Sequence, residues 1–222
     1  LPEILYWLES FDQDLVRSAI PCYFTSRLAA SEVKVILTGE GADELFAGYT
    51  YHKAIVGEDA LHRELRRSIT TLHNINLQRV DRMTMAHSLE GRVPFLDLAV
   101  IEQGLRIPAS LKLPGAGAKE KWVLRKAFED LLPPEIVWRD KEQFDEGSGT
   151  ADLTPRLFAQ AMNEEEAQAY RQRFPNTRLR SAEECHYHLL LCDVFEHPEA
   201  ILANVARWAA RPADLPEGAA GL

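Results

Sequence analysis

The 222-residue sequence has no long apolar run, few cysteines and no excess of basic residues. Its longest apolar stretches, such as Val33–Leu37 with Lys34 inside it, are far shorter than the roughly 20 residues of a membrane span. The 25 Lys and Arg residues are outnumbered by 34 Asp and Glu residues, which gives a net charge of −9. General nucleic-acid binding depends on Lys and Arg facing phosphates, so this balance excludes it. The first residues show no initiator Met and no signal-peptide pattern. We therefore expect an acidic globular protein with neither a nucleic-acid nor a membrane partner.

Only three cysteines are present, Cys22, Cys185 and Cys192, and they cannot all pair with one another. This count excludes a disulfide scaffold and favours a reducing, cytoplasmic compartment. Cys185, His188 and Cys192 would share one face of a helix, which raises the question of a metal site. The sequence lacks the second ligand pair that structural zinc sites use, so we interpret these cysteines as small buried side chains.

Helical patterns dominate most of the chain. The expected helices are 1–10, 15–30 with cap residues at 11–14, then 58–90, 119–132, and several after Thr154 separated by Pro175 and Pro198. Pro21 should kink or delay the second of these helices. By composition, residues 211–222 form a flexible tail, which leaves 1–210 as one region.

Strand signals are scarce. The β-branched run at 33–38 predicts a buried strand, and a brief second strand signal lies at 91–95. A buried strand needs neighbours, because its N–H and C=O groups must be hydrogen-bonded on both edges. We therefore expect a predominantly helical α/β chain that is part of a larger protein, with the partner strands upstream of Leu1.

Glycines and carboxylates directly follow the predicted strand, in the run Thr-Gly-Glu-Gly-Ala-Asp-Glu at 38–44. Ligands of open α/β sheets bind beyond the carboxyl ends of strands, where glycines allow close approach. Three carboxylates would repel a bare phosphate, so this run favours a Mg²⁺ ion that bridges carboxylate and phosphate oxygens. A plain strand–turn–helix junction, with acids that complement the helix N-terminus, is the other interpretation.

Four further motifs follow in a fixed order. The full series is Leu-Thr-Gly-Glu-Gly-Ala-Asp-Glu (37–44), Gly-Tyr-x-Tyr-His-Lys-Ala (48–54), Asp-Arg-Met-Thr-Met-Ala-His-Ser-Leu-Glu-Gly-Arg-Val-Pro-Phe-Leu-Asp (81–97), Glu-Lys-x-x-Leu-Arg (120–125) and Trp-Arg-x-Lys-Glu-Gln-Phe (138–144). Each motif alone is ordinary, because charged helix faces are usually just solvated. Together they resemble the synthetase domain of the glutamine-dependent asparagine synthetases, from about Leu1 to Gly149 and more weakly to His197.

The resemblance implies a fold and an activity. The fold would be part of a Rossmann-like ATP-pyrophosphatase domain of the adenine nucleotide alpha hydrolase type, with 33–38 as one strand. The activity would be ATP- and Mg²⁺-dependent conversion of aspartate to asparagine through β-aspartyl-AMP, with ammonia from glutamine. The family's Ser-Gly-Gly-x-Asp-Ser pyrophosphate loop and its N-terminal glutaminase domain would precede Leu1, so this chain alone would be inactive. Family members are often homodimers.

The resemblance also assigns roles residue by residue. Glu40 would orient ammonia or accept its proton, Arg17 would stabilise the α-phosphate, and Lys141 would balance charge on the phosphates. The implied nucleotide contacts are Thr38, Gly39, Gly41 and Asp43, of which Asp43 also holds Mg²⁺. The implied substrate contacts are Asn76 and Arg79. Arg17 and Lys141 could instead be surface charges.

Three departures from the family pattern keep alternatives open. Asp14-Leu15 replaces Thr-Thr near the phosphates, Ala42 replaces a Ser, and Asn76 replaces an aspartate that would attract the substrate ammonium. The alternatives are a β-lactam-synthetase-like cyclase or another amidotransferase acting on a different carboxylate, and a degenerate homologue without catalysis.

Overall fold

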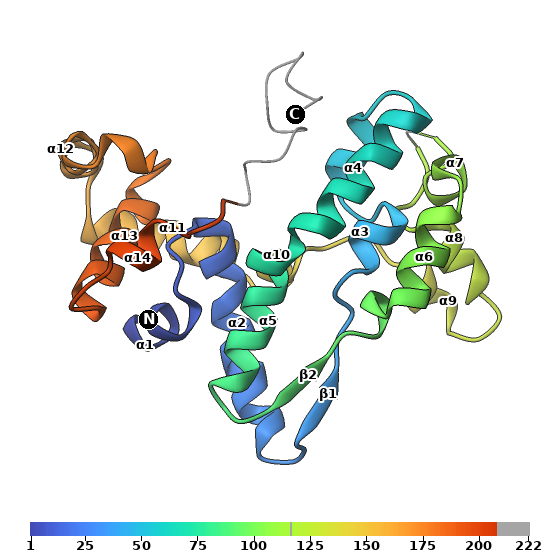
Figure 1. The fold of residues 1–222 in the computed structure, drawn as a ribbon, viewed down its shortest axis with the longest axis horizontal. Helices are drawn as coiled ribbons and strands as arrows, with labels where there is room; N and C mark the ends of the chain where they lie inside the picture. Colours follow the sequence, from blue (N-terminus) through green and yellow to red (C-terminus); the bar gives the residue numbers. More distant parts are fainter. Residues whose placement is uncertain (116, 208–222) are drawn as a thin grey trace. The chain divides into compact units, whose positions relative to one another are not determined.

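The computed structural model describes residues 1–115 and 117–207. The described chain is mostly helical and carries one two-stranded sheet (Figure 1). None of its helices is long and apolar enough to cross a membrane. The tail expected at 211–222 lies outside the described residues.

The elements follow one another in a simple order. They are α1 (Pro2–Leu8), α2 (Gln13–Ala30), β1 (Val35–Leu37), α3 (Ala42–Phe46), η1 (Thr50–Ala54), α4 (Glu58–Thr71), η2 (Leu72–Asn74), α5 (Asn76–Met85), β2 (Glu90–Arg92), η3 (Pro94–Leu96), α6 (Leu98–Arg106), α7 (Ala109–Lys112), α8 (Trp122–Ala127), α9 (Pro134–Val137), α10 (Phe144–Gly147), α11 (Thr150–Ala161), α12 (Glu164–Arg173), η4 (Pro175–Thr177), α13 (Ala182–Val194) and α14 (Glu199–Leu202), where η marks a short 3₁₀ helix.

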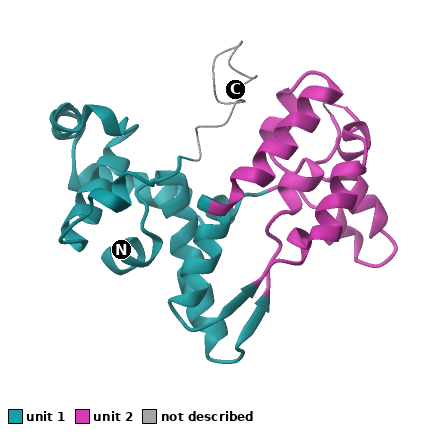
Figure 2. Cartoon of the chain, viewed as in Figure 1, with its two compact units in different colours: residues 1–36, 74–91, 142–208 teal, residues 37–73, 92–141, 209–222 magenta. Residues whose placement is uncertain are grey.

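The described residues form two compact units (Figure 2). Unit 1 comprises 1–36, 74–91 and 142–207, and unit 2 comprises 37–73 and 92–141. In unit 1, α2 packs against α5 and α11, and α13 packs against α1, α11 and α12. Leu5, Leu8, Val16, Met83 and Tyr187 are fully buried in this core. The interpretation of the cysteines as buried side chains is confirmed for Cys185, whereas Cys22 and Cys192 are only partly buried.

The second predicted helix is confirmed as α2. Asp12 caps it, because its carboxylate accepts a hydrogen bond from the Leu15 N–H at 3.1 Å. The helix runs through Pro21, so the predicted delay is wrong. Proline has no N–H for the carbonyl of the residue four positions earlier, which is Arg17. The hydroxyl of Thr150 donates to that carbonyl at 2.9 Å and replaces the missing helical bond.

In unit 2, α3 packs against α4, α6 and α8, and α7 packs against α4 and α8. A small apolar cluster of Ala47, Leu61, Leu65 and Ala109 holds these helices together. The helical pattern at 119–132 overestimates α8, which covers only Trp122–Ala127.

The sheet is parallel, and its strands are short. The Glu90 N–H donates to Lys34 O at 2.9 Å, and the Thr38 N–H donates to Arg92 O at 2.8 Å. The prediction of a buried strand over 33–38 is wrong in extent and in burial: Val35 is 38% exposed and Leu37 is 73% exposed. Parallel sheets are buried only where other elements cover both faces, and the described residues cover these two side chains only in part. The second strand signal, at 91–95, is confirmed in part: β2 covers Glu90–Arg92, and the 3₁₀ helix η3 begins at Pro94.

Candidate functional site

A glycine turn connects β1 to α3 in unit 2. Gly41 caps α3 with a φ of 92°, a left-handed conformation that favours glycine, and a Cβ there would overlap Leu96. At Gly39, by contrast, no described residue apart from its chain neighbours has an atom within 4 Å of the place where a Cβ would stand. The Thr38 hydroxyl oxygen is buried and has no hydrogen-bond partner among the described residues. The open backbone and this hydroxyl are features that a ligand can use.

Asp43, in the first turn of α3, lies between two lysines. Its Oδ1 is 3.0 Å from Lys141 Nζ and 3.1 Å from Lys121 Nζ. Burial alone would raise the pKa of Asp43, but the two ammonium charges outweigh it and lower that pKa. Gly48 makes room for the carboxylate, because a Cβ there would overlap Asp43. These three side chains together carry a net positive charge, which suits a phosphate.

Lys121 was not among the predicted site residues. It has a left-handed backbone (φ 55°), which is strained for a lysine, and its N–H donates to Ala47 O at 3.4 Å. The motif at 120–125 contains it, but nothing in the residue types separates Lys121 from Lys119 or Lys126. The adjacent Glu120 pairs with Lys53 at 2.5 Å, so the motifs at 48–54 and 120–125 meet in this unit.

A buried acid, Glu44, follows Asp43 in the sequence. Glu44 is 1% exposed and accepts a hydrogen bond from the Tyr49 hydroxyl. Burial is the main cause that raises the pKa of Glu44 to about 7 and also raises that of Tyr49. Lys141 Nζ lies 5.8 Å from the centroid of the Tyr49 ring, within cation–π range. Tyr49 therefore connects the buried acid to the lysine that faces Asp43, a connection the sequence did not predict.

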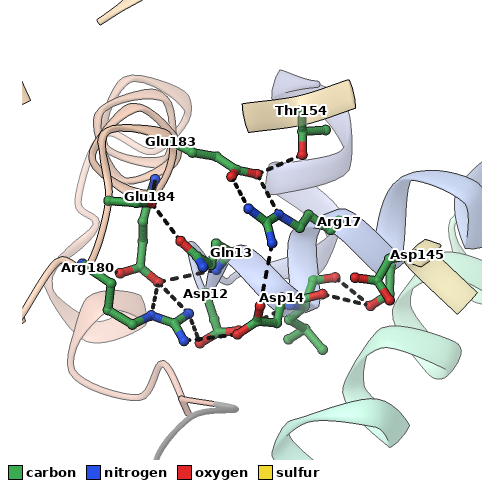
Figure 3. A network of polar contacts seen from close by, with 12 residues as sticks. Asp12, Gln13, Asp14, Arg17, Asp145, Thr154, Arg180, Glu183 and Glu184 are labelled. Atoms are coloured by element: carbon green, nitrogen blue, oxygen red, sulfur yellow. Dashed lines mark hydrogen bonds and ion pairs between the residues drawn. The ribbon is translucent and has the colours of Figure 1, made fainter. Parts of the chain in front are cut away.

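In unit 1, Arg17 is held by a carboxylate from α13 (Figure 3). Its Nε donates to Glu183 Oε1 at 3.0 Å and its Nη2 donates to Glu183 Oε2 at 2.5 Å. Its Nη1 lies 3.9 Å from Asp14 Oδ1. The predicted cation is thus a half-buried, paired side chain rather than a free surface charge, which removes one interpretation left open above.

The same network continues to the start of α2 (Figure 3). Arg180 bonds Asp12, Asp14 and Glu184 at 2.8 to 2.9 Å, and Arg207 Nη2 bonds Glu184 at 2.5 Å. Burial, partly offset by Arg180, raises the pKa of Asp12 to about 6. Burial also opposes ionisation of Glu184, but hydrogen bonds from Arg180 lower its pKa overall.

The nine predicted site residues fall into both units. Thr38, Gly39, Glu40, Gly41, Asp43 and Lys141 belong to unit 2, and Arg17, Asn76 and Arg79 belong to unit 1. The structure brings Asp43 and Lys141 into contact. Asn76 and Arg79 lie on α5 and are 9% and 8% exposed; their substrate role stays a prediction, as does that of the half-buried Glu40.

The residues of unit 2 fit a nucleotide and its metal. The described residues contain no group of three or more His, Cys, Asp or Glu that could hold a metal ion by themselves. Mg²⁺ does not need such a group, because it usually binds one or two carboxylates together with substrate phosphates and water. Asp43 can supply the carboxylate, and the buried Thr38 hydroxyl and the two lysines can face phosphate oxygens.

The chain is similar to a known family and to several known proteins. The family model described as asparagine synthase matches residues 1–58 and 53–204. Asparagine synthetase B (glutamine-hydrolysing) of Escherichia coli is 34% identical over 201 residues, which cover 89% of this chain and 36% of that protein. A probable glutamine-hydrolysing asparagine synthetase of Schizosaccharomyces pombe is 35% identical over 219 residues, covering 94% and 39%. Glutamine-hydrolysing asparagine synthetase 1 of Arabidopsis thaliana is 34% identical over 211 residues, covering 91% and 36%.

The chain thus spans between 36% and 39% of the length of these three relatives. The family match extends over nearly all of the described residues and includes each of the five motifs. The chain belongs to the asparagine synthase family.

Proposed function

We propose that the protein containing this chain converts aspartate to asparagine with ATP, using ammonia released from glutamine. The observation that carries the proposal is the contact of Asp43 with Lys121 and Lys141, next to an open glycine turn. The relatives reported above are named as glutamine-hydrolysing asparagine synthetases, which favours this reaction over a β-lactam-synthetase-like cyclisation.

The reaction has two steps. A β-carboxylate oxygen of aspartate attacks the α-phosphorus of ATP, and pyrophosphate leaves. Ammonia then attacks the acyl carbon of β-aspartyl-AMP, AMP leaves with the carboxylate oxygen, and a proton from nitrogen is transferred to Glu40 or to water. Lys121 and Lys141 balance the charge that develops on pyrophosphate. Mg²⁺, held by Asp43 and the phosphates, would further neutralise this charge when bound.

The remaining assignments belong to the same proposal. Thr38, Gly39 and Gly41 contact the nucleotide, Arg17 faces the α-phosphate, and Asn76 and Arg79 recognise aspartate. Residues 1–210 form part of a Rossmann-like ATP-pyrophosphatase domain. A glutaminase domain in the same protein supplies ammonia, and the protein acts in the cytoplasm, with a homodimer as the family precedent.

The test is pyrophosphate release by the intact protein with Mg²⁺ and ATP, with and without aspartate. Wild type should release pyrophosphate only when aspartate is present. Glu40→Gln should form asparagine at least about 100-fold more slowly, because the amide cannot accept a proton from ammonia. Glu102→Gln is the matched control, since Glu102 is an exposed acid of unit 2 that pairs with Arg106.

Two results would contradict the proposal. Pyrophosphate release independent of aspartate would indicate another carboxylate acceptor. No release at all, from a folded protein, would favour the degenerate homologue, for which Asp14, Leu15 and Asn76 are the motivating departures.

A further inference from the structure

Glu183 is held in place independently of Arg17. Its Oε1 accepts hydrogen bonds from the Thr154 hydroxyl at 2.8 Å and from the Tyr187 hydroxyl at 2.7 Å. The Glu183 side chain is 3% exposed, and both donors are buried with it. A buried carboxylate with several donors has a fixed orientation, so Arg17 pairs with a group that is already positioned.

The pairing uses one particular edge of the Arg17 guanidinium. A guanidinium has a side edge, formed by Nε and one Nη, and an end edge, formed by the two Nη atoms; each edge can bind an anion with two parallel hydrogen bonds. Glu183 occupies the side edge, through Nε at 3.0 Å and Nη2 at 2.5 Å. Nη1, on the end edge, makes no hydrogen bond within the described residues, and the Arg17 side chain is 17% exposed.

Asp14 is the carboxylate nearest to that end edge. Its Oδ1 lies 3.9 Å from Nη1, which is too far for a hydrogen bond. Its other oxygen accepts a hydrogen bond from Arg180 at 2.9 Å (Figure 3). Arg180 therefore neutralises part of the negative charge of Asp14, a residue that stands where the resemblance implies a threonine. The end edge of Arg17 stays available to an anion.

We propose that Glu183 is a positioning residue, which holds the side edge of Arg17 so that its end edge faces the α-phosphate of the nucleotide. This inference rests on the proposed function, because it takes the phosphate contact of Arg17 from there. Glu183 does not touch substrate. It removes rotational freedom from Arg17 before the nucleotide binds, which lowers the entropy lost on binding.

The test compares the affinities of AMP and adenosine for the intact protein, measured by calorimetry. The ratio of the two affinities isolates the contact to the phosphate and does not require aspartate or turnover. Wild type should bind AMP more tightly than adenosine. Glu183→Gln, which keeps the side-chain shape but places an N–H₂ against Nη2, should lower the AMP affinity about tenfold and leave adenosine unchanged.

A double variant separates positioning from plain structural support. If Glu183 acts through Arg17, then Arg17→Gln with Glu183→Gln should bind AMP no more weakly than Arg17→Gln alone. Tyr187→Phe removes one donor to Glu183 without altering any charge, and it should lower the AMP affinity about threefold. It also tests the proposal should Glu183→Gln fail to fold.

Several results would overturn the inference. The first is equal binding of AMP and adenosine by wild type. The second is a folded Glu183→Gln or Tyr187→Phe protein whose ratio of AMP to adenosine affinity equals that of wild type. The third is a loss of AMP affinity by Glu183→Gln that persists in the Arg17→Gln background. If wild type shows no aspartate-dependent pyrophosphate release but the AMP and adenosine affinities are as expected, the proposed function is contradicted and the positioning role of Glu183 is supported.

Discussion

The two units hold their charged clusters in opposite ways. In unit 2, one carboxylate, Asp43, is held by two ammonium groups, so these three side chains together carry an excess positive charge. In unit 1, four carboxylates surround three guanidinium groups, so the cluster carries an excess negative charge. Its members are Asp12, Asp14, Glu183 and Glu184 with Arg17, Arg180 and Arg207.

The difference indicates a division of labour. A positive cluster beside an open glycine turn attracts the highly charged end of a nucleotide. A network of carboxylate–guanidinium pairs instead gives rigidity and leaves a single guanidinium edge available. We expect the unit 2 cluster to supply most of the affinity for pyrophosphate.

The largest expected effect comes from reversing the charge of the unit 2 cluster. Replacing both Lys121 and Lys141 with Met should weaken pyrophosphate binding by about a thousandfold, because two charge-assisted hydrogen bonds are lost. Each single replacement should cost about thirtyfold. Calorimetry on the intact protein measures this, with Lys126→Met as the control, since Lys126 pairs with Glu129 in the same unit. Pyrophosphate binding by the double variant within threefold of wild type would show that the phosphate site lies elsewhere.

The second effect is a pH dependence that belongs to the buried acid of unit 2. The pKa of Glu44 is raised by burial from 4.5 to about 7, so between these values the folded state binds more protons than the unfolded state. The contribution of Glu44 to stability is therefore complete below pH 4.5 and is lost as pH rises towards 7, by up to about 3 kcal/mol. Glu44→Gln should flatten this dependence in chemical-denaturation experiments.

Glu64 is the matched control for the pH experiment. It is a buried glutamate of the same unit, but hydrogen bonds from Arg67 and Tyr51 outweigh burial and lower its pKa. The contribution of Glu64 to stability therefore changes with pH only at values below about 4.5. Glu64→Gln should leave the slope of stability against pH between 4.5 and 7 unchanged. Equal slopes for wild type and Glu44→Gln would contradict the assignment of this titration to Glu44.

The third effect concerns the backbone that supports Arg17. Thr150→Val removes the donor to the carbonyl left free by Pro21 and should lower the free energy of unfolding by about 1–2 kcal/mol. In a Pro21→Ala background the penalty should shrink, because the helix regains its own N–H donor. Thr70→Val is the control, since its hydroxyl bonds a carbonyl on an exposed surface. An equal loss in both backgrounds would assign the effect to side-chain packing.

The smallest expected effect concerns Asp14, a carboxylate of the negatively charged cluster in unit 1. Asp14→Asn removes a carboxylate beside the end edge of Arg17 and should raise the affinity for AMP about threefold. Asp152→Asn, at an exposed acid of the same unit, should have no effect. Weaker AMP binding by Asp14→Asn would show instead that Asp14 helps to orient Arg17.

Local signals in the sequence were sufficient for several elements. The cap at Asp12 and the turn at Gly41 follow from residue types at defined positions, and both are confirmed. Asp43 and Lys141, 98 residues apart, could be assigned to the same phosphate site only because the order of motifs resembles a family; their direct contact was not predicted.

Long-range pairings without a motif could not be predicted. The Arg17–Glu183 pair joins positions 166 residues apart, and Glu183 lies where the resemblance is weak. Lys121 differs from the neighbouring lysines by its left-handed backbone conformation, which cannot be predicted from the residue type. The exposure of Val35 and Leu37 depends on which elements pack over the sheet, whereas a β-branched run indicates only that a strand forms.

The most direct test of the account follows an atom through the proposed reaction. The intact protein is given Mg²⁺, ATP, glutamine and aspartate labelled with oxygen-18 in its β-carboxylate, and the products are analysed by mass spectrometry. If aspartate is adenylated, one labelled oxygen must pass to AMP, and pyrophosphate must stay unlabelled. Label appearing in inorganic phosphate together with ADP, or AMP formed without label, would contradict an adenylate intermediate and the role assigned to this chain.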